Sequence, residues 1–400
     1  MSTLTVAEAQ LAIQSQLPLL ESVSLPLREL SSCVLAEAII MERDQSPFDR
    51  VTMDGIALSA QRNQGTRRLR IAGTQAAGAA TQTLQHDNDC IEVMTGTELP
   101  RGCDCVVPVE RIAVKDGFAQ LEDGFIASEW LNVHRRGSDA KANSTLLQPG
   151  QRLNATEIAI VASAGYARAR VYRSPRIALI STGNELVEPG QPIESWQIRR
   201  SNIHALQAAL QQHGHTRLTD VHLADDLEVL RTRLRALLDS NDVLILSGGV
   251  SMGKFDFVPQ VLTELDVRCV FHKIQQRPGK PMWFGVRDDG KAVYALPGNP
   301  VSTIMCLHRY VLPGLQHAMH FAPSELHTIT LAADAKAHDE IAVFMPIKLQ
   351  RDASGIQQAL PCPTRGSGDF ISLLGTDGFV ELPPAKGMIA AGTTVSLYRW

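Results

Sequence analysis

The chain has 400 residues, which is room for two to four domains at about 150 residues each and excludes a single small binding module. Apolar residues make up 44% of the chain and charged residues 20%, which is typical of a folded globular protein and unlike disordered or fibrous chains. The net charge of −4 gives no overall attraction for nucleic acid or an anionic membrane, so we expect neither as a partner.

The location and redox state of the chain follow from two further features. No apolar stretch approaches the roughly 20 residues that a membrane-spanning helix needs, and the first turns carry Glu8 and several glutamines where a signal peptide would be apolar. We therefore expect a cytoplasmic protein. The seven cysteines are an odd number without a Cys-x-x-Cys motif, which predicts buried free thiols.

The N-terminal half contains helices on either side of a β-rich stretch. Thr5 and Glu8 form a capping box that predicts a first helix, and Asn154 with Glu157 forms another ahead of an apolar segment. Between them, short β-rich runs separated by Gly, Pro and Asp-Gly turns indicate a separate β domain. The sequence therefore predicts an N-terminal domain of residues 1–45 and 140–173, interrupted by an inserted β-rich domain of residues 46–139.

The pattern changes to alternating strands and helices in residues 174–322. Buried strands at 177–180 and 243–246 alternate with helices at 201–212 and 227–238, which predicts a parallel sheet covered on both faces. Residues 323–400 return to strands and turns and predict a small C-terminal β domain. The expected fold class is therefore a multidomain α/β protein.

A glycine-rich loop follows the second buried strand. Ligands in such sheets bind beyond the carboxyl ends of the strands. The glycines of residues 247–253 permit a backbone nest that surrounds a phosphate, with hydroxyls from Ser247 and Ser251. A tight structural connection explains this loop at least as well when it is considered alone.

Two further loops lie in the same region. Arg277 and Lys280 place two cations on a proline-stiffened turn suited to a small oxyanion, and a solvated charged hairpin is the alternative. The segment 296–302 places Pro300 at a helix start with Asn299 as its N-cap, and helix capping alone would explain that segment.

Carboxylates accompany these loops. Glu185 follows the first buried strand, Asp225 ends a strand-like run, and Asp256 follows the glycine loop. Mg²⁺ is held by one or two carboxylates, water and substrate phosphate, so these side chains predict a Mg²⁺ site, although each one alone reads as a solvated charge. The histidines show no zinc motif, and the sequence contains no nucleophile elbow, Walker or Rossmann fingerprint.

Taken together and in this order, the loops resemble the molybdopterin molybdenumtransferase family, which comprises the MoeA proteins and the gephyrin E domain. The resemblance extends over about residues 5–310. The stretches that carry it are 47–55, 94–96, 102–107, 136–139, 181–186, 247–251, 278–281 and 296–302.

The resemblance implies that molybdate is inserted into adenylylated molybdopterin with Mg²⁺-dependent release of AMP. It implies an elongated homodimer whose active site lies between the α/β domain of one subunit and the inserted β domain of the other. It also implies a three-layer α/β molybdopterin-binding domain, an elongated helical N-terminal domain and a small C-terminal β-barrel. Transient contacts with the molybdopterin adenylyltransferase and with acceptor apoenzymes are implied as well.

The resemblance assigns roles to individual residues. Positions needed for activity are Asp54, Thr95, Asp139, Glu185, Asp225, Asp256 and Lys273, and the metal ligands among them are Asp225 and Asp256. Substrate contacts are Ser247, Gly248, Gly249, Ser251, Arg277, Lys280, Pro297, Pro300 and Ser367. Of these, Arg277, Lys280 and Ser367 fall on the molybdate side.

Some positions depart from the family pattern. Arg199 and Arg200 replace an aromatic residue and an acid, which puts substrate contacts there in question. A C-terminal arginine that the family uses for molybdate has no counterpart near Phe344, and Arg365 is a candidate substitute. Two alternative functions stay open: a molybdopterin adenylyltransferase, against which the length of the chain argues, and a non-catalytic scaffold similar to gephyrin.

Overall fold

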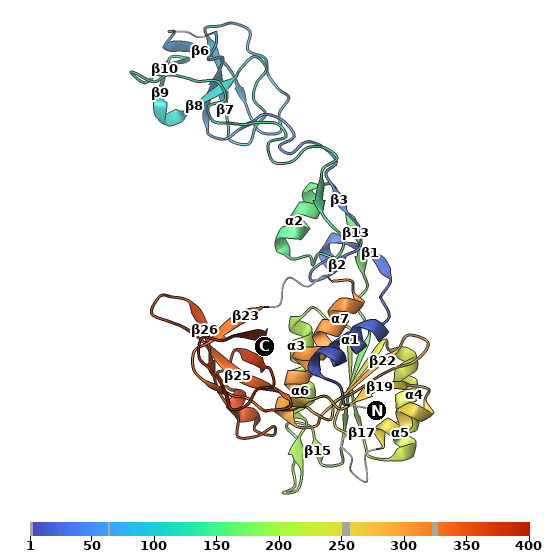
Figure 1. The fold of residues 1–400 in the computed structure, drawn as a ribbon. Helices are drawn as coiled ribbons and strands as arrows, with labels where there is room; N and C mark the ends of the chain where they lie inside the picture. The colour runs from blue at the N-terminus through green and yellow to red at the C-terminus, as the bar shows by residue number, and fades with distance from the viewer. Residues whose placement is uncertain (1–2, 63–64, 250–256, 322–326) are drawn as a thin grey trace. The chain divides into compact units, whose positions relative to one another are not determined.

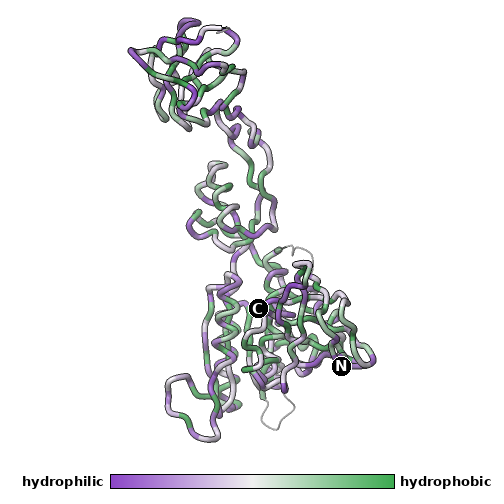
Figure 2. The backbone as a smooth tube through the Cα atoms, turned by 90° about the vertical axis from the view of Figure 1, so that its left-hand side faces the viewer, coloured by the Kyte–Doolittle hydropathy of each residue, from purple (hydrophilic) through white to green (hydrophobic). Residues whose placement is uncertain are grey.

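The computed structural model describes residues 3–62, 65–249, 257–321 and 327–400. The chain divides into two compact units (Figure 1), a larger one of residues 1–37, 149–155 and 168–400 and a smaller one of residues 38–148 and 156–167. Apolar and polar positions are interspersed along the backbone (Figure 2). Within the described residues, no helix combines the length and apolar character needed to cross a membrane.

The larger unit is built on a six-stranded sheet with the order β17–β14–β18–β22–β21–β19. The strands are β14 (Ile177–Thr182), β17 (Leu218–Leu223), β18 (Val243–Ser247), β19 (Arg268–His272), β21 (Trp283–Val286) and β22 (Ala292–Leu296). The first four strands in the spatial order run parallel, as predicted. β21 is antiparallel to both β19 and β22. The turn between β21 and β22, closed by a hydrogen bond from the Arg287 N–H to the Lys291 carbonyl, leaves no room for the crossover that parallel strands need.

Helices cover both faces of this sheet, which confirms the three-layer arrangement (Figure 1). Ile177 and Leu179 of β14 point to one core, and Ala178 and Ile180 point to the other, because successive strand residues face opposite sides. The first core includes α1 (Val6–Gln16), α3 (Ser201–Gln212), α6 (Pro300–Cys306) and α7 (Leu312–Ala318), the last two joined by the π-helix η3 (Leu307–Val311). The second core includes α4 (Leu227–Ser240) and α5 (Val258–Glu264).

The first helix begins at the predicted capping box. The Glu8 N–H donates to Thr5 Oγ1 at 3.3 Å, and the Thr5 N–H donates to Glu8 Oε2 at 2.8 Å. Its buried residues Val6, Ala9 and Ile13 belong to the α/β core, although the sequence pattern groups this helix with residues 140–173. A three-stranded sheet of β1 (Ser22–Pro26), β13 (Arg168–Tyr172) and β2 (Val34–Leu35) completes this part of the unit.

The C-terminal region forms the expected barrel. Five strands close on themselves through the pairing of β25 with β27, and the apolar side chains of Ile347, Val380 and Leu382 fill the interior. The strands are β23 (Thr328–Leu331), β25 (Ala342–Arg351), β26 (Gln357–Pro361), β27 (Gly378–Leu382) and β29 (Thr394–Arg399). The short strand β20 (Gln276–Arg277) pairs with β25, and a second short pair joins β24 (Ala335–Lys336) to β28 (Met388–Ile389).

The smaller unit is β-rich, with a six-stranded sheet in the order β8–β5–β7–β6–β10–β9. These strands are β5 (Gly55–Leu58), β6 (Arg68–Gln75), β7 (Asp89–Val93), β8 (Cys105–Pro108), β9 (Ile112–Lys115) and β10 (Phe118–Leu121). Short pairs join β3 (Ile39–Ile40) to β12 (Thr145–Leu147) and β4 (Arg50–Val51) to β11 (Val133–His134), and α2 (Ala155–Ser163) is the predicted second helix. All seven cysteines of the chain are free, as predicted, but only Cys90, Cys105 and Cys306 are buried and the other four are partly exposed. Burial raises the pKa of Cys90 and Cys105 to about 12.

Candidate functional site

The strand order reverses between β14 and β18, because the chain leaves β14 toward β17 on one side and then crosses to β18 on the other. Loops at such a reversal separate at the carboxyl ends of the strands and leave a crevice for ligands. The predicted residues Glu185, Asp225, Ser247, Gly248 and Gly249 follow or end these strands, so the fold brings them to one edge of the sheet.

The described part of the glycine loop has a backbone that other residues rarely adopt. Gly248 and Gly249 have φ angles of 98° and 72°. A Cβ on Gly249 would lie 2.7 Å from Val258 Cγ2 and 2.9 Å from Thr182 Oγ1, so a side chain is excluded there. The Thr182 hydroxyl is buried and has no hydrogen-bond partner within the described part of the chain, which leaves it able to bind a ligand or water. The predicted residues Ser251 and Asp256 lie outside the described residues.

Asn202 joins the glycine loop to the next site loop. From the first turn of α3, its Nδ2 lies 2.9 Å from Ser247 Oγ, 2.8 Å from the Gly298 carbonyl and 3.2 Å from Thr303 Oγ1. The sequence analysis did not assign a role to this asparagine. From sequence alone, an asparagine in the first turn of a helix is usually interpreted as a residue that caps that helix. Only the folded chain shows which loops its side chain reaches.

Two carboxylates lie at the ends of β14 and β17. The Glu185 carboxylate folds over Gly183, within 2.7 Å of the place where a Cβ on that glycine would stand. The Asp225 N–H donates to Asn184 Oδ1 at 3.3 Å, which ties the two strand ends together. The neighbouring Asp226 has a structural role, because its Oδ1 accepts from the Glu228 N–H at 3.0 Å and caps α4.

The two arginines that depart from the family pattern are occupied by structural contacts. Arg200 is 9% exposed, and its guanidinium donates to Ser181 Oγ at 2.9 Å, to Asp220 Oδ1 at 2.6 Å and to Glu188. Arg199 donates to the main-chain carbonyls of Glu188 and Gln191 at 2.9 and 2.8 Å. Both charges are therefore used to fix the strand end and the loop that follows it.

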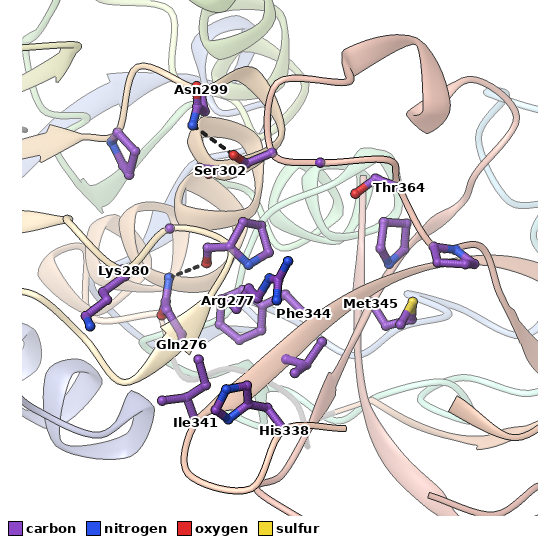
Figure 3. A pocket seen from close by; sticks show the side chains of 18 of the residues that line it. Gln276, Arg277, Lys280, Asn299, Ser302, His338, Ile341, Phe344, Met345 and Thr364 are labelled. Carbon is purple, nitrogen blue, oxygen red and sulfur yellow. Dashed lines mark hydrogen bonds between the residues drawn. The ribbon is translucent and has the colours of Figure 1, made fainter. Parts of the chain in front are cut away.

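A cavity of about 690 Å³ lies between the turn at 276–281, the start of α6 and the barrel (Figure 3). Among the described residues that line it, every charged side chain is a cation, and hydroxyls and one imidazole supply further donors. The cations are Arg277, Lys280, Lys336 and Arg365, and the other donors include Ser302, His338, Thr364 and Ser367. Such a wall favours an anion.

The turn that carries Arg277 and Lys280 is held rigidly. A Cβ on Gly279, whose φ is 93°, would lie 2.6 Å from Gln276 Nε2 and 2.7 Å from Cys306 Sγ. Gln276 is 1% exposed, and its Nε2 donates to the Pro278 carbonyl at 3.1 Å. The buried framework therefore holds the backbone while both cationic side chains remain exposed.

The loop at 296–302 differs from its prediction. Asn299 precedes α6 as expected, but its side chain makes no capping hydrogen bond and instead donates from Nδ2 to Ser367 Oγ at 2.8 Å. The Val301 N–H also donates to the Ser367 carbonyl, at 3.1 Å. Pro300 is at the helix start as predicted, and Pro297 lines the cavity. The asparagine is thus used to hold Ser367 at the cavity, because a second chain segment packs against the helix start.

The predicted residues Asp54, Thr95 and Asp139 form two hydrogen-bonded pairs in the smaller unit. Asp54 Oδ1 accepts from the Thr95 N–H at 2.6 Å and from Thr95 Oγ1 at 2.7 Å, and these hydrogen bonds lower the pKa of Asp54. Asp139 Oδ1 lies 2.7 Å from His134 Nε2, a histidine that the sequence analysis missed. In the larger unit, Lys273 follows β19 and its N–H donates to the Met282 carbonyl at 3.0 Å.

Comparison with known families covers almost the whole chain. Residues 4–165 match the MoeA N-terminal region, described as domains I and II, and residues 328–400 match the MoeA C-terminal region, described as domain IV. Residues 178–317 match a probable molybdopterin binding domain. The matched segments together contain the glycine loop, the cationic cavity and the two residue pairs of the smaller unit.

Individual relatives agree over their full length. A molybdopterin molybdenumtransferase from Synechocystis is 39% identical, with 99% of this chain and 100% of that protein aligned. One from Staphylococcus aureus is 27% identical, covering 98% of this chain and 94% of the relative. The solved structure of a molybdopterin biosynthesis MoeA protein from Pyrococcus horikoshii superposes with a TM-score of 0.78 at 27% identity, covering 100% of this chain and 99% of that one.

Proposed function

The chain belongs to the MoeA family of molybdopterin molybdenumtransferases, which are transferases of molybdenum cofactor biosynthesis, and from this premise we propose that it inserts molybdate into adenylylated molybdopterin with Mg²⁺-dependent release of AMP. The observation that carries the proposal is the cavity whose described charged residues are all cations. Molybdate is a compact dianion, and a wall of cations and hydroxyl donors compensates its charge.

The molybdate end of the reaction is assigned to Arg277, Lys280 and Ser367. The rigid turn limits the conformational freedom that the two cations lose on binding, and their exposed charges lie on the cavity wall. Ser367 Oγ accepts a hydrogen bond from Asn299, so its own hydrogen can donate to an oxyanion. Arg365 adds a cation from the barrel, in place of the arginine missing near Phe344.

The pterin end is assigned to the edge of the sheet that carries Ser247, Gly248 and Gly249. The glycines leave space for a phosphate to approach the backbone. The Thr182 hydroxyl, which has no hydrogen-bond partner among the described residues, supplies a donor beside it. Asn202 connects this edge to the loop that begins at Pro297, so the two ends of the substrate are held by one hydrogen-bonded framework.

Mg²⁺ fits the donor chemistry at the same edge. Glu185 and Asp225 offer hard carboxylate oxygens from adjacent strands beside the phosphate loop, and Asp225 with Asp256 remains the assigned ligand pair. A bound ion would supply positive charge beside the phosphoanhydride. In the proposed step, a molybdate oxygen forms a bond to the pterin-side phosphorus, the P–O bond to AMP breaks and AMP leaves, so no protein nucleophile is needed.

A homodimer is part of the proposal. The Asp54–Thr95 and Asp139–His134 pairs lie in the smaller unit, where we assign them to the site of a partner subunit. Contacts with the adenylyltransferase and with acceptor apoenzymes, and a cytoplasmic location, are further parts of the same proposal.

The test is AMP release from purified adenylylated molybdopterin, measured with and without molybdate and Mg²⁺. We expect release that requires both and that stops when the metal is chelated. Formation of adenylylated molybdopterin from ATP would instead assign the adenylyltransferase activity. Substrate binding without any turnover would assign a scaffold.

A further inference from the structure

His338 enters the cavity from a part of the chain to which the sequence analysis assigned no role. It lies on the turn between β24 and β25, and its imidazole lines the same cavity as Arg277 (Figure 3). The pairing of Arg277 with Val343 and the hydrogen bond from the Ala342 N–H to the Gln275 carbonyl bring the two turns together. Residues about 60 positions apart in sequence therefore form one wall.

The His338 ring is fixed in one orientation. Its Nδ1 accepts a hydrogen bond from the Glu340 N–H at 3.1 Å. A main-chain N–H can only donate, so Nδ1 holds a lone pair and the neutral ring carries its hydrogen on Nε2. The turn is held as well, because the His338 carbonyl accepts from the Ala385 N–H and the Ala337 N–H donates to the Gly387 carbonyl, both at 3.0 Å.

The rest of the barrel wall contributes few ordered donors. Phe344, Met345 and Pro346 present apolar side chains to the cavity. Lys336 and Arg365 are exposed, and neither side chain makes a hydrogen bond within the described part of the chain. Long flexible side chains lose up to about 2 kcal/mol of conformational entropy when a ligand orders them. His338 is already ordered, so its N–H donor is available at a smaller entropic cost.

We propose that His338 is a binding residue for the tetrahedral oxyanion, to which it donates the Nε2 hydrogen from the barrel side of the cavity. The inference rests on the proposed function and extends it, because it adds a binding residue, His338, that lies outside the segments that carry the family resemblance. The Arg277 and Lys280 turn holds the anion on one side, and His338 holds it on the side where the barrel offers apolar residues.

The test measures binding of inorganic molybdate alone, by equilibrium dialysis at one fixed pH for all variants. We expect His338→Ala to raise the dissociation constant about 10-fold or more, which corresponds to one hydrogen bond to a charged group. His338→Gln retains an N–H donor and should lie within about threefold of the unmodified protein. His327→Ala, an exposed histidine of the same barrel outside this cavity, is the matched control and should change nothing.

The outcomes separate the inference from the proposed function. Equal binding by the unmodified protein and His338→Ala overturns the inference alone, and so does a loss in His338→Gln as large as in His338→Ala. An unmodified protein that binds no molybdate overturns both. Thermal unfolding of each variant confirms that it is folded.

Discussion

Asp242 shows how single charges stabilise the scaffold of the site. Its side chain is 9% exposed at the start of β18, and its Oδ2 accepts from Arg173 Nη1 at 2.7 Å and from the Arg176 N–H at 2.8 Å. Burial alone would raise the pKa of Asp242, but the hydrogen bonds from the two arginines outweigh it and hold that pKa well below its usual value. The ionised carboxylate therefore favours the folded state.

We predict that Asp242→Asn lowers the free energy of unfolding at pH 7 by about 1.5–3 kcal/mol, because the hydrogen bonds from the partly exposed Arg173 and Arg176 lose their ionised acceptor. Denaturant-induced unfolding provides the measurement. Since the folded-state pKa lies below the unfolded-state value of about 3.9, the contribution is present above that pH and is lost as the pH falls below it. The difference in the free energy of unfolding between Asp242→Asn and the unmodified protein should therefore decrease as the pH falls.

Asp239→Asn is the matched control. Asp239 is 64% exposed and pairs with Arg287 at 3.2 Å, so its loss should cost about 1 kcal/mol or less. A similar loss of stability in both variants would contradict the role given to the Asp242 carboxylate. So would a loss of stability in Asp242→Asn that does not change with pH.

At the scale of elements, periodicity and turn chemistry predicted most of the larger unit. The helices α3 and α4 and the strands β14 and β18 lie where the pattern placed them, because each has an apolar face that must be buried against the sheet. The sequence predicted a parallel sheet, and the antiparallel direction of β21 was missed because a short buried run does not indicate the direction of a strand.

Long-range pairing explains which site residues were missed. Asn202 reaches the site because the start of α3 lies against two of the site loops. His338 reaches it because β20 pairs with β25. Asn202 follows the charged pair Arg199 and Arg200, and His338 precedes two acidic residues. Neither stretch shows from the sequence alone which loop the side chain reaches. Arg277 and Lys280 could be predicted because their cations and the prolines of one short turn are adjacent in sequence.

At the scale of the whole molecule, the proposed function assigns roles to residues of both units. The family resemblance could be predicted from the order of the loops, and the comparisons with relatives confirm it over the full chain. The cationic cavity and the glycine loop lie in the larger unit, whereas the Asp54 and Asp139 pairs lie in the smaller one. A homodimer in which each subunit completes its partner's site would use all of these residues.

We predict that mixing Asp54→Ala chains with Glu185→Ala chains restores activity that neither variant has alone. In randomly mixed dimers, half are hybrids with one intact site of two, so about a quarter of the unmodified activity should return. The variants are dissociated together, reassociated and assayed for AMP release. No recovery, together with sedimentation as a monomer at micromolar concentration, would count against the shared site.

The assignment of the cationic cavity to molybdate is tested most directly by a pair of titrations on Lys280→Ala, one varying molybdate and one varying adenylylated molybdopterin. Loss of one charge-assisted contact of about 1.5–3 kcal/mol should raise the half-saturating molybdate concentration roughly 10- to 150-fold, with a much smaller change for the pterin. Lys348→Ala, an exposed lysine of β25 outside the cavity lining, should leave both titrations unchanged. An equal rise in both titrations of Lys280→Ala, or an unchanged molybdate dependence, would contradict the assignment of this cavity to molybdate.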